Sequence, residues 1–140
     1  MSRSGPILIY EDNSDEQEIF REAFRLTGVA NRLRFFTTGE ELMHYLRTTE
    51  DRPFLIISNV GSHLLNGLEV RRLINEDQVL RRKSIPFIFF STTAEPHQVH
   101  KAFDLSAQGY FLRPTGLDDL TAQLKLLVDY WKLSLHPNVL

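Results

Sequence analysis

The stretch Phe54-Leu55-Ile56-Ile57-Ser58 decides the fold of this chain, because it is a short apolar run that stops abruptly at Asn59. A continuous apolar run of this length is typical of a strand covered on both faces, as in a parallel sheet. Four similar runs alternate with longer amphipathic segments. The expected strands are Ile7–Tyr10, Leu33–Phe36, Phe54–Ser58, Phe87–Ser91 and Gly109–Leu112. This alternation predicts an α/β fold, a doubly wound five-stranded parallel sheet in which a βα unit is repeated five times.

Length and composition set the class of protein. The 140 residues predict one domain, 1–140, with a core at about 6–131 and a C-terminal tail at 132–140. A net charge of −2 gives no basic footprint for nucleic acid, and no apolar run is long enough to span a membrane. There is no cysteine, which excludes disulfides and thiol chemistry and agrees with a cytoplasmic location.

Polar residues follow two of the expected strands at the point where each ends. Glu11 and Asp12 come directly after Ile7–Tyr10, and Asn59 follows Phe54–Ser58. The carboxyl ends of neighbouring parallel strands meet at one edge of the sheet, where such folds place their sites. Two carboxylates and one amide are therefore expected to meet where three carboxylates would form a site for a metal ion and phosphoryl transfer.

Four separated motifs occur in an order that resembles the response-regulator receiver domain of two-component signalling, in its chemotaxis-type single-domain form. They are the acidic pair Glu11-Asp12, the segment 59–70, Ser91 at the end of a strand, and the segment 107–114, Ala-Gln-Gly-Tyr-Phe-Leu-Arg-Pro. The resemblance covers nearly the whole chain. It implies a flavodoxin-like fold and a role in phosphorelay signal transduction, with a histidine kinase or a downstream signalling protein as partner.

The resemblance also implies roles for individual residues. Glu11, Asp12 and the carbonyl of Gly61 would hold Mg²⁺ together with residue 59, the phosphoacceptor position. The switch positions of the family fall on the hydroxyl of Ser91, the aromatic ring of Tyr110 and the cation of Arg113. No other cofactor is expected.

The chain departs from the family pattern around this site. The acceptor position is Asn59, and a neutral amide is a poor nucleophile. Arg113 stands where the family has Lys, and an arginine presents its charge as a wide planar fork. His63 and Asn66 replace the Pro and Asp usual in the loop. We therefore expect a degenerate receiver, or pseudo-receiver, that is not an enzyme, acts through protein–protein interaction and retains at most weak Mg²⁺ binding.

Two alternatives remain open at this stage. Phosphorylation would continue if another residue, Ser58 or Ser62, accepted the phosphoryl group, or if Asn59 were converted to Asp. A flavodoxin-like cofactor binder is the other alternative. It is disfavoured because a phosphate would have to bind after the first strand, where the carboxylates of Glu11-Asp12 repel an anion.

The last expected helix carries apolar residues at helical spacing, and an aromatic tail follows it. The segment 128–137, which contains Tyr130 and Trp131, resembles the aromatic tail of single-domain receivers that partner phytochrome-like kinases. In that subgroup this end of the chain helps to form a dimer. We expect a homodimer through the last helix and tail, with these two aromatic residues as anchors.

Two charged clusters have simpler interpretations. His97 and His100 share a helical face but lack a third ligand, so we expect a solvated face rather than a metal site. Arg71-Arg72 and the segment 81–83, Arg-Arg-Lys, are likewise expected on a solvated face, with an acidic partner surface as the alternative.

Overall fold

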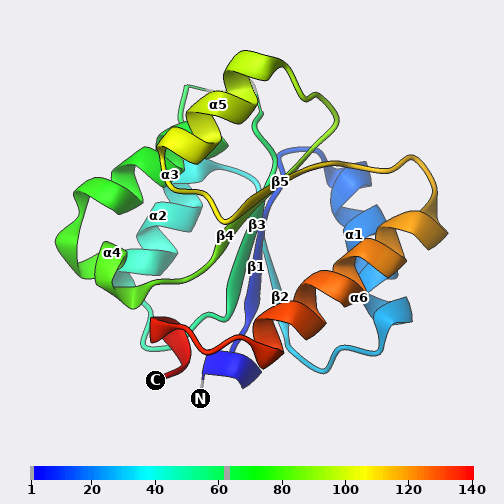
Figure 1. The fold of residues 1–140 in the computed structure, drawn as a ribbon, viewed down its shortest axis with the longest axis horizontal. Coiled ribbons are helices and arrows are strands. Elements are labelled where there is room, and N and C mark those ends of the chain that lie inside the picture. The colour runs from blue at the N-terminus through cyan, green and yellow to red at the C-terminus, as the bar shows by residue number, and fades with distance from the viewer. Residues whose placement is uncertain (1, 62–63) are drawn as a thin grey trace.

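A five-stranded parallel sheet runs through the centre of the molecule in the order β2-β1-β3-β4-β5 (Figure 1). The computed structural model describes residues 2–61 and 64–140. The strands are β1 (Ile7–Tyr10), β2 (Leu33–Phe36), β3 (Leu55–Ser58), β4 (Phe87–Ser91) and β5 (Gly109–Leu112). The prediction of a doubly wound, flavodoxin-like α/β fold is confirmed, and each expected strand is found within one residue of its predicted bounds.

Helices cover both faces of the sheet. They are α1 (Ser14–Thr27), α2 (Gly39–Thr48), α3 (Gly67–Glu76), α4 (Gln78–Lys83), α5 (Pro96–Asp104) and α6 (Leu117–Leu133), with short 3₁₀ helices η1 (Ser2–Ser4) and η2 (Pro137–Val139). In Figure 1, α1 and α6 lie on one side of the sheet and α2, α3 and α4 on the other. Each side encloses its own apolar core, because strand side chains alternate between the two faces.

The expected repeat of five βα units is wrong at one place. Where one helix was predicted between β3 and β4, the described part of the chain has two, α3 and α4. The N–H of Asp77 bonds to the carbonyls of Leu73 and Ile74 and ends α3, while its carboxylate accepts from the N–H groups of Val79 and Leu80. Asp77 thus closes one helix and caps the next.

Arg71 is a second correction. The sequence places it in a cluster expected on a solvated face, but the structure buries it, with 7% of its surface exposed. The other members of the cluster behave largely as expected. Arg72 pairs with Glu69 and Glu76 along the partly exposed side of α3, and Arg81 lies exposed on the last turn of α4.

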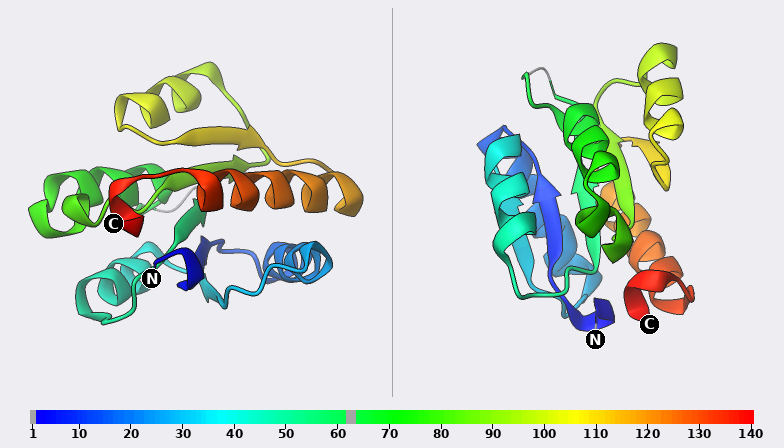
Figure 2. Two further views of the ribbon diagram at one scale, coloured as in Figure 1. Left: turned by 60° about the horizontal axis from the view of Figure 1, so that its bottom comes forward. Right: turned by 90° about the vertical axis from the view of Figure 1, so that its left-hand side faces the viewer.

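The two ends of the chain meet beneath the sheet, at the edge from which the strands start (Figure 2). The hydroxyl of Ser2 donates to the carbonyl of Asn138. The side chain of Asn138 donates to the carbonyls of Pro53 and Phe54 at 3.1 and 3.3 Å. The tail is therefore an integral part of this domain. Among the described residues, no helix is long and apolar enough to cross a membrane.

Candidate functional site

The register of the strands brings the predicted site residues to one edge of the sheet. Tyr10 of β1 is level with Ser58 of β3, so the residues that follow these strands emerge side by side. They line a hollow of about 520 Å³ at the carboxyl ends of the strands. Its wall consists of Glu11, Asp12, Asn13, Glu16, Asn59, Gly61, Phe90, Ser91, Thr92, Thr93, Gln98 and Arg113.

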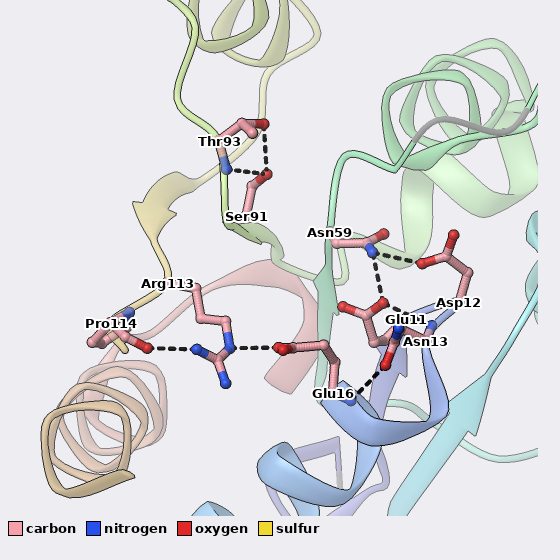
Figure 3. Close-up of polar contacts among 9 residues, drawn as sticks. All are labelled: Glu11, Asp12, Asn13, Glu16, Asn59, Ser91, Thr93, Arg113 and Pro114. Carbon is pink, nitrogen blue, oxygen red and sulfur yellow. Dashed lines mark hydrogen bonds and ion pairs between the residues drawn. The ribbon is translucent and has the colours of Figure 1, made fainter. Parts of the chain in front are cut away.

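The amide of Asn59 faces the acidic pair directly (Figure 3). Its Nδ2 donates to Glu11 Oε2 at 2.9 Å and to Asp12 Oδ1 at 3.2 Å. The main-chain N–H of Asn59 bonds to the carbonyl of Tyr10 at 3.1 Å, which holds the residue at the end of β3. An N–H₂ group thus meets the carboxylate oxygens that a divalent cation would bind.

Glu11 is the more deeply placed acid of the pair, with 6% of its surface exposed. Burial raises the pKa of its carboxyl to about 7, and the nearby charge of Asp12 acts in the same direction. The N–H of Asn13, which donates to Glu11 Oε2 at 3.0 Å, opposes that increase in pKa. Near neutral pH this carboxyl is therefore partly protonated.

Two glycines shape the loop that follows Asn59. Gly61 has a φ of 72°, in the left-handed region that favours glycine. A Cβ on Gly67 would collide with the main-chain oxygen of Asn59, so a glycine there lets α3 begin directly against the end of β3. Glu11, Asp12 and Gly61, the residues predicted to hold Mg²⁺, all line the hollow. The amide of Asn59, as oriented here, presents N–H groups to the two carboxylates.

The cation of Arg113 lies in the wall of the hollow but points toward α1 (Figure 3). Its Nε lies 2.6 Å from Glu16 Oε2, and the arginine side chain is only 9% exposed. Its Nη1 also donates to the carbonyl of Pro114 at 2.6 Å. The positive charge at the switch position Arg113 is therefore paired with Glu16 inside the protein.

Ser91 and Tyr110 both contact the loop after β4. Ser91 Oγ, which is buried, accepts from the N–H of Thr93 at 3.2 Å, and the hydroxyl of Tyr110 donates to the carbonyl of Thr93 at 2.7 Å. The Tyr110 ring stacks on Phe89 at a centroid distance of 5.7 Å. Tyr110 does not itself line the hollow and reaches it through Thr93.

Sequence reasoning missed Glu16 and Thr93. A signal existed for each, since Glu16 lies in the first turn after the acidic pair and Thr93 lies two residues beyond β4. Of the other candidates, His97 and His100 are exposed on α5. No cluster of three or more His, Cys, Asp or Glu able to hold a metal occurs within residues 2–61 and 64–140. Ser62 and His63 lie outside the described residues.

Comparison with known proteins identifies the family. A sequence model of the response regulator receiver domain matches residues 7–125. The probable methanogenesis regulatory protein FilR2 of Methanothrix harundinacea is 24% identical over 129 residues, which cover 89% of this chain and 82% of that protein. Response regulator Rcp1 of Synechocystis sp. is 22% identical over 130 residues, which cover 89% and 87% of the two chains.

Solved structures share the fold. The phosphorylated cyanobacterial phytochrome response regulator RcpA superposes with a TM-score of 0.81 at 26% identity, covering 94% of this chain and 96% of that one. The family match extends over most of the sequence, and the site lies where the strand ends of the shared fold converge. The chain belongs to the response regulator receiver domain family of two-component signalling.

Proposed function

We propose that this receiver domain is a pseudo-receiver, which binds a histidine kinase or a downstream signalling protein without accepting a phosphoryl group at residue 59. The observation that carries the proposal is the pair of hydrogen bonds from Asn59 Nδ2 to Glu11 and Asp12, at 2.9 and 3.2 Å. An amide has no negative oxygen to attack phosphorus. Its N–H groups also satisfy the two carboxylates that would otherwise recruit the metal ion.

Mg²⁺ binding at this site is weak in our proposal. The carboxylates of Glu11 and Asp12 and the carbonyl of Gly61 are hard oxygen donors of the kind that Mg²⁺ prefers. Entry of the ion requires the two hydrogen bonds from Asn59 to break, and one anionic ligand is missing. Response regulator Rcp1, a relative of this chain, has been solved in a Mn²⁺-bound form. Bound Mg²⁺ would here supply only charge neutralisation of the acidic pair.

The surface around α5 and β5 does not depend on a phosphoryl group in this proposal. Ser91 and Tyr110 both bond to Thr93, and the positive charge of Arg113 is satisfied by Glu16. The bonds to Thr93 hold the loop after β4, and the pair with Glu16 holds Arg113 against α1. A partner would therefore meet a surface whose arrangement is set by the chain itself.

We further propose a homodimer through α6. A groove of about 510 Å³ lies along this helix and the edge strand β5, lined by Gln108, Phe111, Gln123, Leu126, Leu127, Tyr130 and Trp131. Leu126 and Tyr130 are 70% and 62% exposed, an unusual exposure for large apolar side chains on adjacent turns. Contact with a second copy would remove both from water. Asn138 and Val139 of the tail are buried against their own chain, so we place the interface on the exposed face of α6.

We also propose that the protein catalyses no reaction, binds no nucleic acid and meets its partners in the cytoplasm. The cytoplasmic location agrees with the absence of cysteine. Membership of the receiver family favours this function over the alternative of a flavodoxin-like cofactor binder.

Intact mass spectrometry after incubation with acetyl phosphate and Mg²⁺ tests the proposal. The natural sequence is expected to gain no phosphoryl adduct, whereas Asn59→Asp is expected to gain one that is labile in base. An adduct on the natural sequence would refute the pseudo-receiver. It would direct attention to Ser58, whose buried hydroxyl donates to the carbonyl of Asn59 at 2.7 Å, or to Ser62.

A further inference from the structure

A second cavity lies at the opposite edge of the sheet from the candidate site. It has a volume of about 140 Å³ and sits between the beginnings of β3 and β4 and helices α2, α3 and α4. Its wall consists of Leu46, Ile56, Arg71, Ile74, Asn75, Leu80, Arg81, Ser84, Ile85 and Gln108. Half of these residues are apolar, and two of the polar ones are arginines.

Arg71 is a buried cation without a buried anion. Its Nε donates to the carbonyl of Leu105 at 3.0 Å and its Nη2 to that of Ser106 at 2.8 Å. Among the described residues, no carboxylate lies within ion-pair distance of it, although it is only 7% exposed. A guanidinium removed from water is costly unless its charge is compensated, and burial accordingly lowers the pKa of Arg71. Two carbonyl dipoles and the ring of Phe87, whose centroid lies 5.6 Å from the Arg71 Cζ, compensate that charge only in part.

The free edge of this guanidinium has the geometry of a carboxylate receptor. A guanidinium carries five N–H donors in a planar fork, and the two bonds to Leu105 and Ser106 use those of its Nε–Nη2 side. The end formed by Nη1 and Nη2 has no other hydrogen bond or ion pair within the described part of the chain. Two parallel N–H groups at such an end match the two oxygens of one carboxylate.

The surroundings of the cavity reinforce the positive charge. Arg81 also lines it and has no ion-pair partner among the residues that the structure describes, whereas Arg82 and Lys83 line a different hollow beside Glu50 and Asp51. The mouth of the cavity thus favours the approach of an anion, while Leu46, Ile74 and Leu80 offer an apolar interior.

We propose that this cavity binds a small monocarboxylate with an apolar body, its carboxylate on the free end of Arg71 and its body against Leu46, Ile74 and Leu80. The volume sets the size of the ligand. An apolar cavity of about 150 Å³ accepts a benzene molecule, so a body of about six carbon atoms fits here. Benzoate and hexanoate have this size and charge.

Isothermal titration calorimetry with sodium benzoate and with sodium hexanoate, at constant ionic strength, tests the proposal on the full chain. Saturable binding of at least one is expected, and benzamide, which has the same shape without the charge, should bind at least tenfold more weakly. Arg71→Met should weaken carboxylate binding at least tenfold. Arg71→Lys should weaken it too, because a lysine keeps the charge but lacks the fork.

Arg72→Met is the matched control, because Arg72 is the neighbouring arginine and pairs with Glu69 and Glu76 outside the cavity. It should leave benzoate binding unchanged. Backbone amide shifts of ¹⁵N-labelled protein locate the site without any variant, and they should cluster at Leu80, Ile85 and Gln108. Absence of saturable binding by both carboxylates would overturn the proposal, as would equal binding of benzamide or shifts that cluster elsewhere. Equal binding of inorganic phosphate would show general anion attraction and would also overturn it.

Discussion

Arg113 and Glu16 form an ion pair, with Nε and Oε2 2.6 Å apart, that joins the loop after β5 to the first turn of α1. The pair directs the cation of Arg113 to the carboxylate of Glu16, which lies in the same hollow (Figure 3). A phosphoryl group at residue 59 would have to compete with Glu16 for this charge. Two groups of the site are therefore already bonded to side chains of the protein: Arg113 to Glu16, and the acidic pair to Asn59.

Loss of the Glu16 carboxylate should release Arg113. In an Asn59→Asp background, Glu16→Gln is expected to increase the rate of labelling by acetyl phosphate roughly fivefold, since an ion pair of about 1 kcal/mol no longer holds the cation away. The rate is measured by intact mass over time at fixed Mg²⁺. Glu18→Gln on the same helix is the control, because Glu18 pairs with Arg21 on the surface. An unchanged rate in Glu16→Gln would mean that the ion pair does not limit Arg113.

Replacement of Asn59 by Asp should make the stability of the protein depend on Mg²⁺. In EDTA, Asn59→Asp removes two donated hydrogen bonds and adds a third carboxylate, so we expect the free energy of unfolding to fall by about 2 kcal/mol. Added Mg²⁺ should restore that stability, because three carboxylates share one cation.

Urea unfolding with and without 10 mM Mg²⁺ measures this effect. Asn59→Ala is the control, because it also loses both hydrogen bonds but gains no metal ligand. Its stability should respond to Mg²⁺ much less than that of Asn59→Asp, because it lacks the third carboxylate. If Mg²⁺ stabilised the natural sequence as strongly as Asn59→Asp, the site would already be a strong metal site, contrary to our proposal.

The strands and the meeting of Glu11, Asp12 and Asn59 could be predicted from the sequence because both depend on local patterns. A strand buried on both faces is a continuous apolar run, and parallel strands end at the same edge of the sheet. From the sequence alone, the start of α4 could not be distinguished from a turn. Asp77 lies in a polar run, and its capping role becomes visible only when its carboxylate is seen to accept from Val79 and Leu80.

The partners of the two arginines lie far away in sequence, which is why their environments were not predicted. Arg113 and Glu16 belong to opposite ends of the chain, and Arg71 bonds to carbonyls 34 and 35 residues away. A buried arginine that binds backbone carbonyls has no acidic counterpart to look for in the sequence. In the sequence, Arg71 therefore cannot be distinguished from a solvated arginine until the fold is known.

Glu11 should make stability depend on pH in the absence of metal. Its folded-state pKa is raised from 4.5 to about 7, so the folded state binds a proton more tightly than the unfolded chain does. The resulting stabilisation is fully present below about pH 4.5 and is lost as pH rises through 7, by an amount on the order of 3 kcal/mol at most.

Urea unfolding in EDTA between pH 4.5 and 8 measures this dependence. Glu11→Gln should flatten the profile, since a glutamine keeps an oxygen for Asn59 Nδ2 but does not titrate. The exposed Glu18→Gln is the control and should leave the slope unchanged. A slope that survives in Glu11→Gln would assign the titration to another group.

The exposed face of α6 should mediate self-association. Leu126 and Tyr130 lie one turn apart on this helix and line the groove beside β5, so a second copy would bury both. We expect sedimentation velocity from about 1 to 100 µM to show a monomer–dimer equilibrium, typical of a modest interface. Leu126→Glu should shift the dissociation constant upward at least tenfold, because it places a charge in the centre of the contact. Leu135→Glu is the matched control, since Leu135 is 74% exposed on the tail and does not line the groove. A protein that remains monomeric throughout this range would refute the dimer and leave the groove to a different partner.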